Sequence, residues 1–184
     1  MQDNPWIIKG EKQLYTNPWI NVTEYDVTNP GGGKGIYGKV HFKNTAVGIL
    51  VLDEEHNTYL VGQYRFTLNT YSWEIPEGGS PLETDPLENG KRELREETGL
   101  VAANWEVLLQ MHLSNSVTDE YAMVYLATGL TLQDPEPEET EQLVVKKMPF
   151  EEAYQMVEKG VITDAISVAA IIKVKLLLAE GKLK

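Results

Sequence analysis

The sequence predicts a mixed α/β sandwich, in which strands lie on both sides of one helix and a final helix closes the chain. Two observations support this fold class. Short apolar runs of strand-like composition precede residue 80 and return after residue 100, whereas residues 86–98 have clear helix start and stop signals. Residues 164–179 again carry apolar side chains at helical spacing.

The N-terminal part of the chain is predicted to consist of strands. Residues 19–27 alternate between apolar and polar side chains with one change of phase at Thr23–Glu24, which predicts a strand with a bulge. Residues 29–33, Asn-Pro-Gly-Gly-Gly, predict a turn. Residues 36–42 predict a second strand, and 46–52 predict a third that is buried on both faces.

The later elements follow from the same patterns. Further strands are predicted over 59–64, 72–75, 105–113, 121–128 and 143–147, and amphipathic helices over 150–159 and 164–179. Residues 114–120 and the acidic, proline-containing 133–142 are predicted loops. Five apolar residues of the last helix are expected to pack in the core: Ala165, Val168, Ala169, Ile172 and Leu176.

Composition excludes several functional classes. A chain of 184 residues fits one domain with a small appended segment. The absence of cysteine excludes disulfides, thiolate catalysis and Cys-based zinc sites, and the net charge of −12 argues against nonspecific binding to nucleic acids or anionic membranes. Because neither an apolar run near eighteen residues nor a secretory signal is visible, we expect no membrane span and a cytoplasmic location.

The helix predicted over 86–98 has caps at both ends. Asp85 is the expected N-cap with Pro86 at the first helical position, and Gly99 is the expected C-cap. The helix carries the densest acidic chemistry of the chain.

Three glutamates of this helix, Glu93, Glu96 and Glu97, are expected to share one face. Their carboxylates repel one another unless a cation lies among them, and hard oxygen ligands suit Mg²⁺, with Mn²⁺ as an alternative. A solvated acidic face balanced by nearby Lys and Arg is the competing interpretation.

The spacing around the helix resembles the signature of the Nudix hydrolases, Gly-x5-Glu-x7-Arg-Glu-U-x-Glu-Glu-x-Gly-U, where U is a bulky aliphatic residue. Eight of its nine defined positions match between Gly78 and Leu100. The exception is Thr84, where the family has Glu. We therefore expect Arg92 to pair with Glu83 or Asp85 instead.

A second departure is Asn89-Gly90 inside the helix, where glycine costs about 1 kcal/mol relative to alanine. Neither departure removes an expected metal ligand.

The resemblance implies an α/β/α sandwich with a mixed sheet, and a Mg²⁺ site held by Glu93, Glu96 and Glu97 together with the carbonyl of Glu77. Glu93 and Glu97 then also count as catalytic residues. The general base would come from a loop after the helix, for which the candidates are Glu136, Glu138, Glu139 and Glu141, with Glu139 aligning best.

Two further segments are similar to the ADP-ribose pyrophosphatase group of this family. Gln63-Tyr64-Arg65 resembles a motif whose arginine contacts the diphosphate, and residues 73–79, Trp-Glu-Ile-Pro-Glu-Gly-Gly, resemble the run before the signature. A surface ion pair is the alternative for Arg65. Glu120, which ends a polar loop, is a lesser candidate for contact with metal or substrate.

The resemblance implies Mg²⁺-dependent hydrolysis of a nucleoside diphosphate linked to a sugar, with ADP-ribose giving AMP and ribose 5-phosphate as the leading case. The alternatives are another NDP-sugar, a dinucleotide such as NADH, or a noncatalytic nucleotide-sugar sensor. We expect residues 1–40 to form a strand segment that contributes to a homodimer and its substrate site, and 41–184 to form the Nudix domain. No nucleic-acid or membrane partner is expected.

Overall fold

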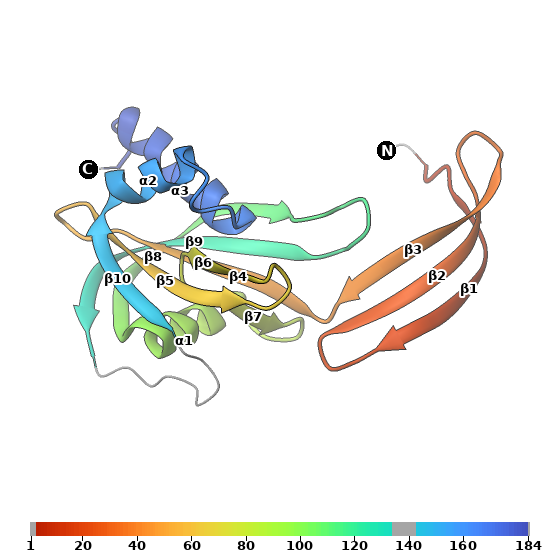
Figure 1. Ribbon diagram of the computed structural model, residues 1–184, viewed down its shortest axis with the longest axis horizontal. Coiled ribbons are helices and arrows are strands. Elements are labelled where there is room, and N and C mark those ends of the chain that lie inside the picture. Colours follow the sequence, from red (N-terminus) through yellow and green to blue (C-terminus); the bar gives the residue numbers. More distant parts are fainter. Residues whose placement is uncertain (1–2, 134–142, 184) are drawn as a thin grey trace.

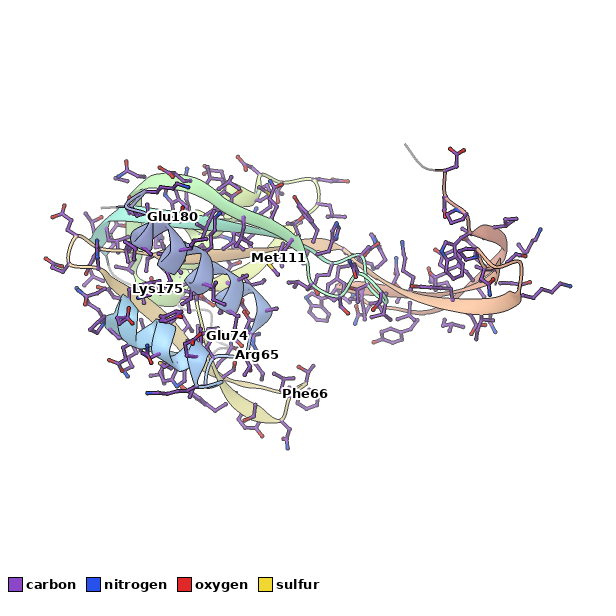
Figure 2. The ribbon with its side chains drawn as sticks, turned by 90° about the horizontal axis from the view of Figure 1, so that it is seen from above. Arg65, Phe66, Glu74, Met111, Lys175 and Glu180 are labelled. Atoms are coloured by element: carbon purple, nitrogen blue, oxygen red, sulfur yellow. The ribbon has the colours of Figure 1, made fainter. Side chains whose placement is uncertain are left out.

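The N-terminal strands form a sheet of their own that extends away from the rest of the protein (Figure 1 and, from above, Figure 2). The computed structural model describes residues 3–133 and 143–183. The sheet consists, in spatial order, of β1 (Ile7–Thr16), β2 (Ile20–Thr28) and β3 (Lys34–Phe42), all antiparallel. We call residues 3–42 the N-terminal arm.

The prediction of a bulge at Thr23–Glu24 is wrong. The register between β2 and β3 runs without a break through these residues. The irregularities lie in β1, between Ile8 and Gly10 and between Gln13 and Tyr15, so the extra residues belong to the neighbouring strand.

The rest of the described chain forms a three-layer body, with α1 below the sheets and α2 and α3 above them in Figure 1. A four-stranded sheet has the order β7-β4-β9-β8 and a three-stranded sheet the order β10-β5-β6. Because β4 is parallel to β9 and antiparallel to β7, the larger sheet is mixed, as expected. The elements are β4 (Asn44–Val51), β5 (Asn57–Arg65), β6 (Thr70–Glu74), β7 (Glu77–Pro81), α1 (Pro86–Thr98), β8 (Leu100–His112), β9 (Tyr121–Leu132), β10 (Val144–Pro149), α2 (Phe150–Glu158) and α3 (Ala165–Ala179).

Strand β4 is buried on both faces, as its apolar run predicts. Val47 and Ile49 belong to the core cluster that includes Leu94 of α1. Leu50, on the opposite face, belongs to the cluster that includes Ile171 of α3. This one strand therefore holds α1 and α3 on opposite sides of the sheet.

Gly90 allows α1 to lie close to β4. A Cβ atom at this position would be 3.1 Å from a methyl group of Val47, tighter than ordinary van der Waals contact. The loss of helix propensity at Gly90 is thus accompanied by close packing of the helix on the sheet.

The core-facing side of α3 differs from the prediction. Its buried residues are Ile166, Ser167, Ala170, Ile171 and Val174. Ala165 is exposed, and Ile172 and Leu176 are 47% and 51% exposed. The prediction was wrong for these three because α3 is apolar on nearly every side, so periodicity does not distinguish its faces.

The arm meets the body at β3, which lies beside the loop between β8 and β9. The backbone N–H of Val40 donates to Val117 O (2.9 Å), and Asp119 accepts from His41 Nδ1 (2.7 Å) and from the Phe42 N–H (2.9 Å). Partial burial opposes ionisation of Asp119, but these hydrogen bonds prevail and lower its pKa to about 2.

No helix within the described part of the chain combines the length and the apolar character needed to cross a lipid bilayer.

Candidate active site

Helix α1 begins and ends where its capping residues predict. Asp85 accepts a hydrogen bond from the Leu87 N–H (2.9 Å), and Gly99 adopts a left-handed conformation with φ 71° while donating to Arg95 O (2.8 Å). These caps fix the register of the helix, and with it the direction of its acidic face.

The structure brings together the four glutamates expected at the metal site. Glu77, Glu93, Glu96 and Glu97 all line a cavity of about 330 Å³ between α1 and the start of β7. Their side chains are largely buried, and Glu97 is only 9% exposed. The competing interpretation of a solvated acidic face does not fit this burial.

Two close contacts hold the acidic face of α1 against β7. The Glu93 side chain lies over Gly78, where an added Cβ would be 2.3 Å from Glu93 Cδ. The Glu77 N–H donates to Glu97 Oε2 at 3.2 Å. The glycine therefore allows the backbone of β7 to approach these carboxylates closely.

The expected pairing of Arg92 with Glu83 or Asp85 is wrong. Arg92 pairs along its own helix, with Glu93 at 2.5 Å and with Glu96. Glu96 lies one turn from Arg92 and is its neighbour on the helix surface, so Arg92 needs no partner in the preceding loop.

Thr84, which replaces the family's Glu, closes the loop before α1. Its hydroxyl group donates to Pro81 O (2.8 Å), accepts from Asn89 Nδ2 (2.9 Å) and lies 3.1 Å from the Ser80 hydroxyl oxygen. A network of neutral hydrogen bonds thus holds the loop at this position.

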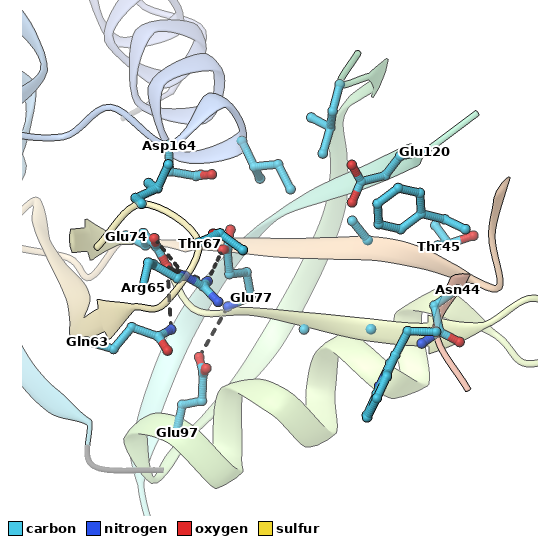
Figure 3. Close-up of a pocket in the computed structure, with 18 residues that line it drawn as sticks. Asn44, Thr45, Gln63, Arg65, Thr67, Glu74, Glu77, Glu97, Glu120 and Asp164 are labelled. Atoms are coloured by element: carbon cyan, nitrogen blue, oxygen red, sulfur yellow. Dashed lines mark hydrogen bonds and ion pairs between the residues drawn. The ribbon is translucent and has the colours of Figure 1, made fainter. Parts of the chain in front are cut away.

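A second cavity of about 700 Å³ adjoins the first and shares with it Glu77, Glu97 and Trp19 (Figure 3). Arg65, the residue expected to contact a diphosphate, lines this cavity. It is not the surface ion pair of the alternative interpretation, because its partner Glu74 is only 3% exposed.

Arg65 forms ion pairs of 2.5 Å with both Glu74 and Glu77. Burial opposes charge on the guanidinium and on Glu74, but the hydrogen bonds between them outweigh it, so the pKa of Arg65 is raised and that of Glu74 is lowered. Arg65 and Glu74 are therefore a persistent charge pair.

Glu77 has the opposite character. Burial, together with the negative charges of Asp164 and Glu74, raises its pKa well above the ordinary value. Its Oε2 atom is buried and has no hydrogen-bond partner among the described residues. A buried carboxylate oxygen without a donor is suited to accept a cation or a ligand donor.

The donor set fits a hard divalent cation. Glu77, Glu93, Glu96 and Glu97 line one cavity, and the oxygens of carboxylates and backbone carbonyls are ligands that suit Mg²⁺. Among residues 3–133 and 143–183, no three acidic or histidine side chains already form a ligand cluster. Arg92 pairs with Glu93 and Glu96, so these two carboxylates are turned toward the guanidinium.

The larger cavity also contains residues that the sequence did not indicate. Glu120, the lesser candidate, does line it, but so do Gln63, Glu74 and Asp164. Asp164 comes from the start of α3, about ninety residues beyond Glu74 in the chain. Only the fold brings it to the cavity, and its sole sequence signal was that of a helix N-cap.

The four candidates for the general base, Glu136, Glu138, Glu139 and Glu141, lie outside the described residues. Leu143, the first described residue after them, lines the smaller cavity.

Comparison with known proteins supports the same fold. A family model described as NUDIX domain matches residues 42–170. The ADP-ribose pyrophosphatase of Mycobacterium tuberculosis (strain ATCC 25618 / H37Rv) is 35% identical over 169 residues, covering 90% of this chain and 81% of the relative. The CMP-5'-(N-acetyl-N-hydroxy-3-aminopropyl)phosphonate hydrolase of Streptomyces rubellomurinus (strain ATCC 31215) is 30% identical over 155 residues, covering 84% of this chain and 75% of the relative. A crystal structure of an ADP compounds hydrolase has a TM-score of 0.82 at 18% identity and covers 100% of both chains, which confirms the expected α/β/α sandwich.

Proposed function

The chain belongs to the NUDIX domain family, as a Nudix pyrophosphohydrolase, and on that premise we propose that it hydrolyses ADP-ribose to AMP and ribose 5-phosphate with Mg²⁺. The observation that carries this proposal is the continuity of the two cavities. One is lined by the carboxylates of α1 and the other by Arg65, and Glu77 and Glu97 belong to both. A diphosphate can thus lie across cation ligands and a guanidinium at once.

The residues have distinct roles in this proposal. Glu93, Glu96 and Glu97, with Glu77, hold the divalent cation, which when bound neutralises phosphate charge and lowers the pKa of a water molecule. Arg65 binds the diphosphate through Nη1 of its planar fork of donors, because Nε and Nη2 donate to Glu74 and Glu77. Glu74 keeps that fork oriented, because it accepts from both Nε and Nη2 of Arg65.

Glu139 remains the proposed general base. A base must reach the attacking water, and Leu143, which follows the acidic loop, lines the cavity of the α1 carboxylates. This supports a base from the segment just before Leu143.

Trp19 is the proposed contact for the nucleobase. It comes from the turn between β1 and β2, is 64% exposed and lines both cavities. An exposed indole at the mouth of a polar cavity offers a flat surface for stacking.

The proposal of a homodimer is based on the exposed apolar side chains of the N-terminal arm. A three-stranded sheet needs a buried apolar face, yet the arm exposes large side chains that include Ile8 (58%), Tyr15 (53%) and Ile36 (71%). We propose that a second copy of the chain packs against these side chains. The arm is then an N-terminal segment that precedes the Nudix domain. Light scattering of the purified protein tests this, and a monomer at micromolar concentration contradicts it.

The substrate is tested with a panel of compounds that share a diphosphate or phosphonate link. We would measure Mg²⁺-dependent release of phosphate monoesters from ADP-ribose, ADP-glucose, UDP-glucose, NADH and a CMP-linked phosphonate, coupled to a phosphatase. The proposal predicts the highest kcat/KM for ADP-ribose. A higher value for another compound would replace it as the substrate.

The sensor hypothesis is tested with the same panel by calorimetry. Binding of a nucleotide sugar without turnover at any metal concentration would favour the sensor. The retention of Glu93, Glu96 and Glu97 argues against it.

A further inference from the structure

Asp164 occupies a fixed place at the start of α3. Its Oδ2 atom accepts from the Ser167 N–H at 2.7 Å and so caps the helix. The Ser167 hydroxyl, which is fully buried, accepts from the Ile75 N–H at 2.9 Å. Because Ile75 lies between Glu74 and Glu77, this contact holds Asp164 beside the carboxylates that pair with Arg65.

The wall of the larger cavity formed by Asp164 has a distinct chemistry. Figure 3 shows Asp164 and Glu120 on the side of the cavity remote from α1, with Arg65 and Glu77 below them. Asp164 is close enough to Glu120 for its negative charge to add to burial in raising the pKa of Glu120. Arg65 is the only positively charged residue among the described residues that line this cavity.

Such a wall repels an anion and attracts hydroxyl groups. Arg65 and the α1 carboxylates with their cation account for a diphosphate, so the remaining carboxylates face whatever is attached beyond it. A carboxylate is an acceptor only, and neutral hydroxyl donors match it without adding negative charge. The cap uses Oδ2 of Asp164, whereas Oδ1 has no hydrogen bond to another described residue.

We propose that Asp164 is a specificity-determining residue, whose carboxylate, with Glu120, accepts hydrogen bonds from the hydroxyls of the sugar beyond the diphosphate. The enzyme then selects a neutral polyhydroxylated group at that end of the substrate and disfavours a further phosphate. This inference rests on the proposed function, and it names the chemistry at one end of the substrate.

The test compares two substrates that differ only beyond the diphosphate. ADP-ribose presents ribose hydroxyls there, and the β-methyl ester of ADP presents a methyl group in the same diphosphate diester. Steady-state kcat and KM would be measured for both compounds with the wild type, Asp164→Asn and Asp164→Ser. Serine and asparagine both retain the N-cap of α3 through their one side-chain oxygen, and neither has a second acceptor oxygen for the sugar.

We expect the Asp164 variants to lose kcat/KM for ADP-ribose but not for the methyl ester. Asp164→Ser lowers kcat/KM for ADP-ribose by about tenfold or more, mainly through KM, because a hydrogen bond to a charged group is removed. The same variant changes kcat/KM for the methyl ester by no more than about twofold. Asp164→Asn has a comparable loss on ADP-ribose, because its one oxygen is used by the helix cap and its NH2 group replaces the free acceptor Oδ1. The ratio of the two kcat/KM values cancels any loss of folded enzyme.

An equal loss on both substrates would show that Asp164 acts only through the helix cap or through Arg65, and would overturn the inference. No loss on either substrate would overturn it as well. A wild type that hydrolyses neither compound would refute the proposed function itself, and the inference would fall with it.

Discussion

The side chain of Glu93 in α1 occupies the space beside Gly78 in β7 that any larger residue would fill. An added Cβ at residue 78 would lie 2.3 Å from Glu93 Cδ and 2.5 Å from Oε1. The first glycine of the signature is therefore coupled by direct contact to the first glutamate of its acidic run.

Gly78→Ala tests this coupling. The backbone at residue 78 does not have a positive φ, so alanine is permitted there and its methyl group acts by displacing Glu93. We expect a loss of activity of about 100-fold with little change in Tm, since ligand misplacement by about 1 Å has this effect. Mg²⁺ titration of activity and calorimetric melting measure the two quantities.

Gly79→Ala is the matched control. Its Cβ would meet only the flexible Asn44 amide, at 3.1 Å, so the loss should be much smaller. Equal losses in the two variants would contradict a specific role for the contact between Gly78 and Glu93.

The stability that Asp119 contributes at the contact between the arm and the body should depend on pH. The pKa of Asp119 in the folded protein, about 2, lies below its ordinary value of 3.8. The ionised group therefore stabilises the fold above pH 3.8, and this contribution is lost as the pH falls through 2. Urea unfolding of the wild type and of Asp119→Asn measures it. The stability difference should shrink below pH 4, and an undiminished difference at pH 3 would contradict this assignment.

Removal of the buried hydroxyl groups of Thr58 and Ser167 should have opposite effects on the free energy of unfolding. Thr58 is 1% exposed and its hydroxyl has no partner among the described residues, so Thr58→Val should be neutral or stabilise by up to about 1 kcal/mol. Ser167 accepts from the Ile75 N–H, so Ser167→Ala should cost about 1–3 kcal/mol. Chemical denaturation compares them, and a larger cost for Thr58→Val would be inconsistent with this assignment.

The sequence was most informative where local chemistry determines structure. The bounds of α1, Pro86–Thr98, were predicted because Asp85 and Gly99 act within one turn of the helix. The acidic face of α1 followed from spacing alone. By contrast, β7 was not predicted, because Glu-Gly-Gly-Ser-Pro has no alternating pattern and becomes a strand only by pairing with β4.

The rest of the site depends on contacts between distant segments. Asp164 reaches the cavity because Ser167 is hydrogen-bonded to Ile75, and no periodicity encodes that contact. Arg92 was assigned the wrong partners because the loop around Thr84 is held by its own hydroxyl network. Tertiary contacts of this kind are not visible in a single sequence.

The proposed function requires the α1 carboxylates to support Mg²⁺-dependent cleavage of the diphosphate. The most direct measurement is product analysis of ADP-ribose hydrolysis by the wild type, Glu97→Gln and the control Glu106→Gln, an exposed change on β8. Glutamine can still accept from the Glu77 N–H, so the fold should be retained. We expect equal amounts of AMP and ribose 5-phosphate from the wild type and the control, dependent on Mg²⁺, and a loss of about 100-fold or more in Glu97→Gln. Undiminished turnover by Glu97→Gln, or turnover that is insensitive to chelation of the metal, would contradict the account.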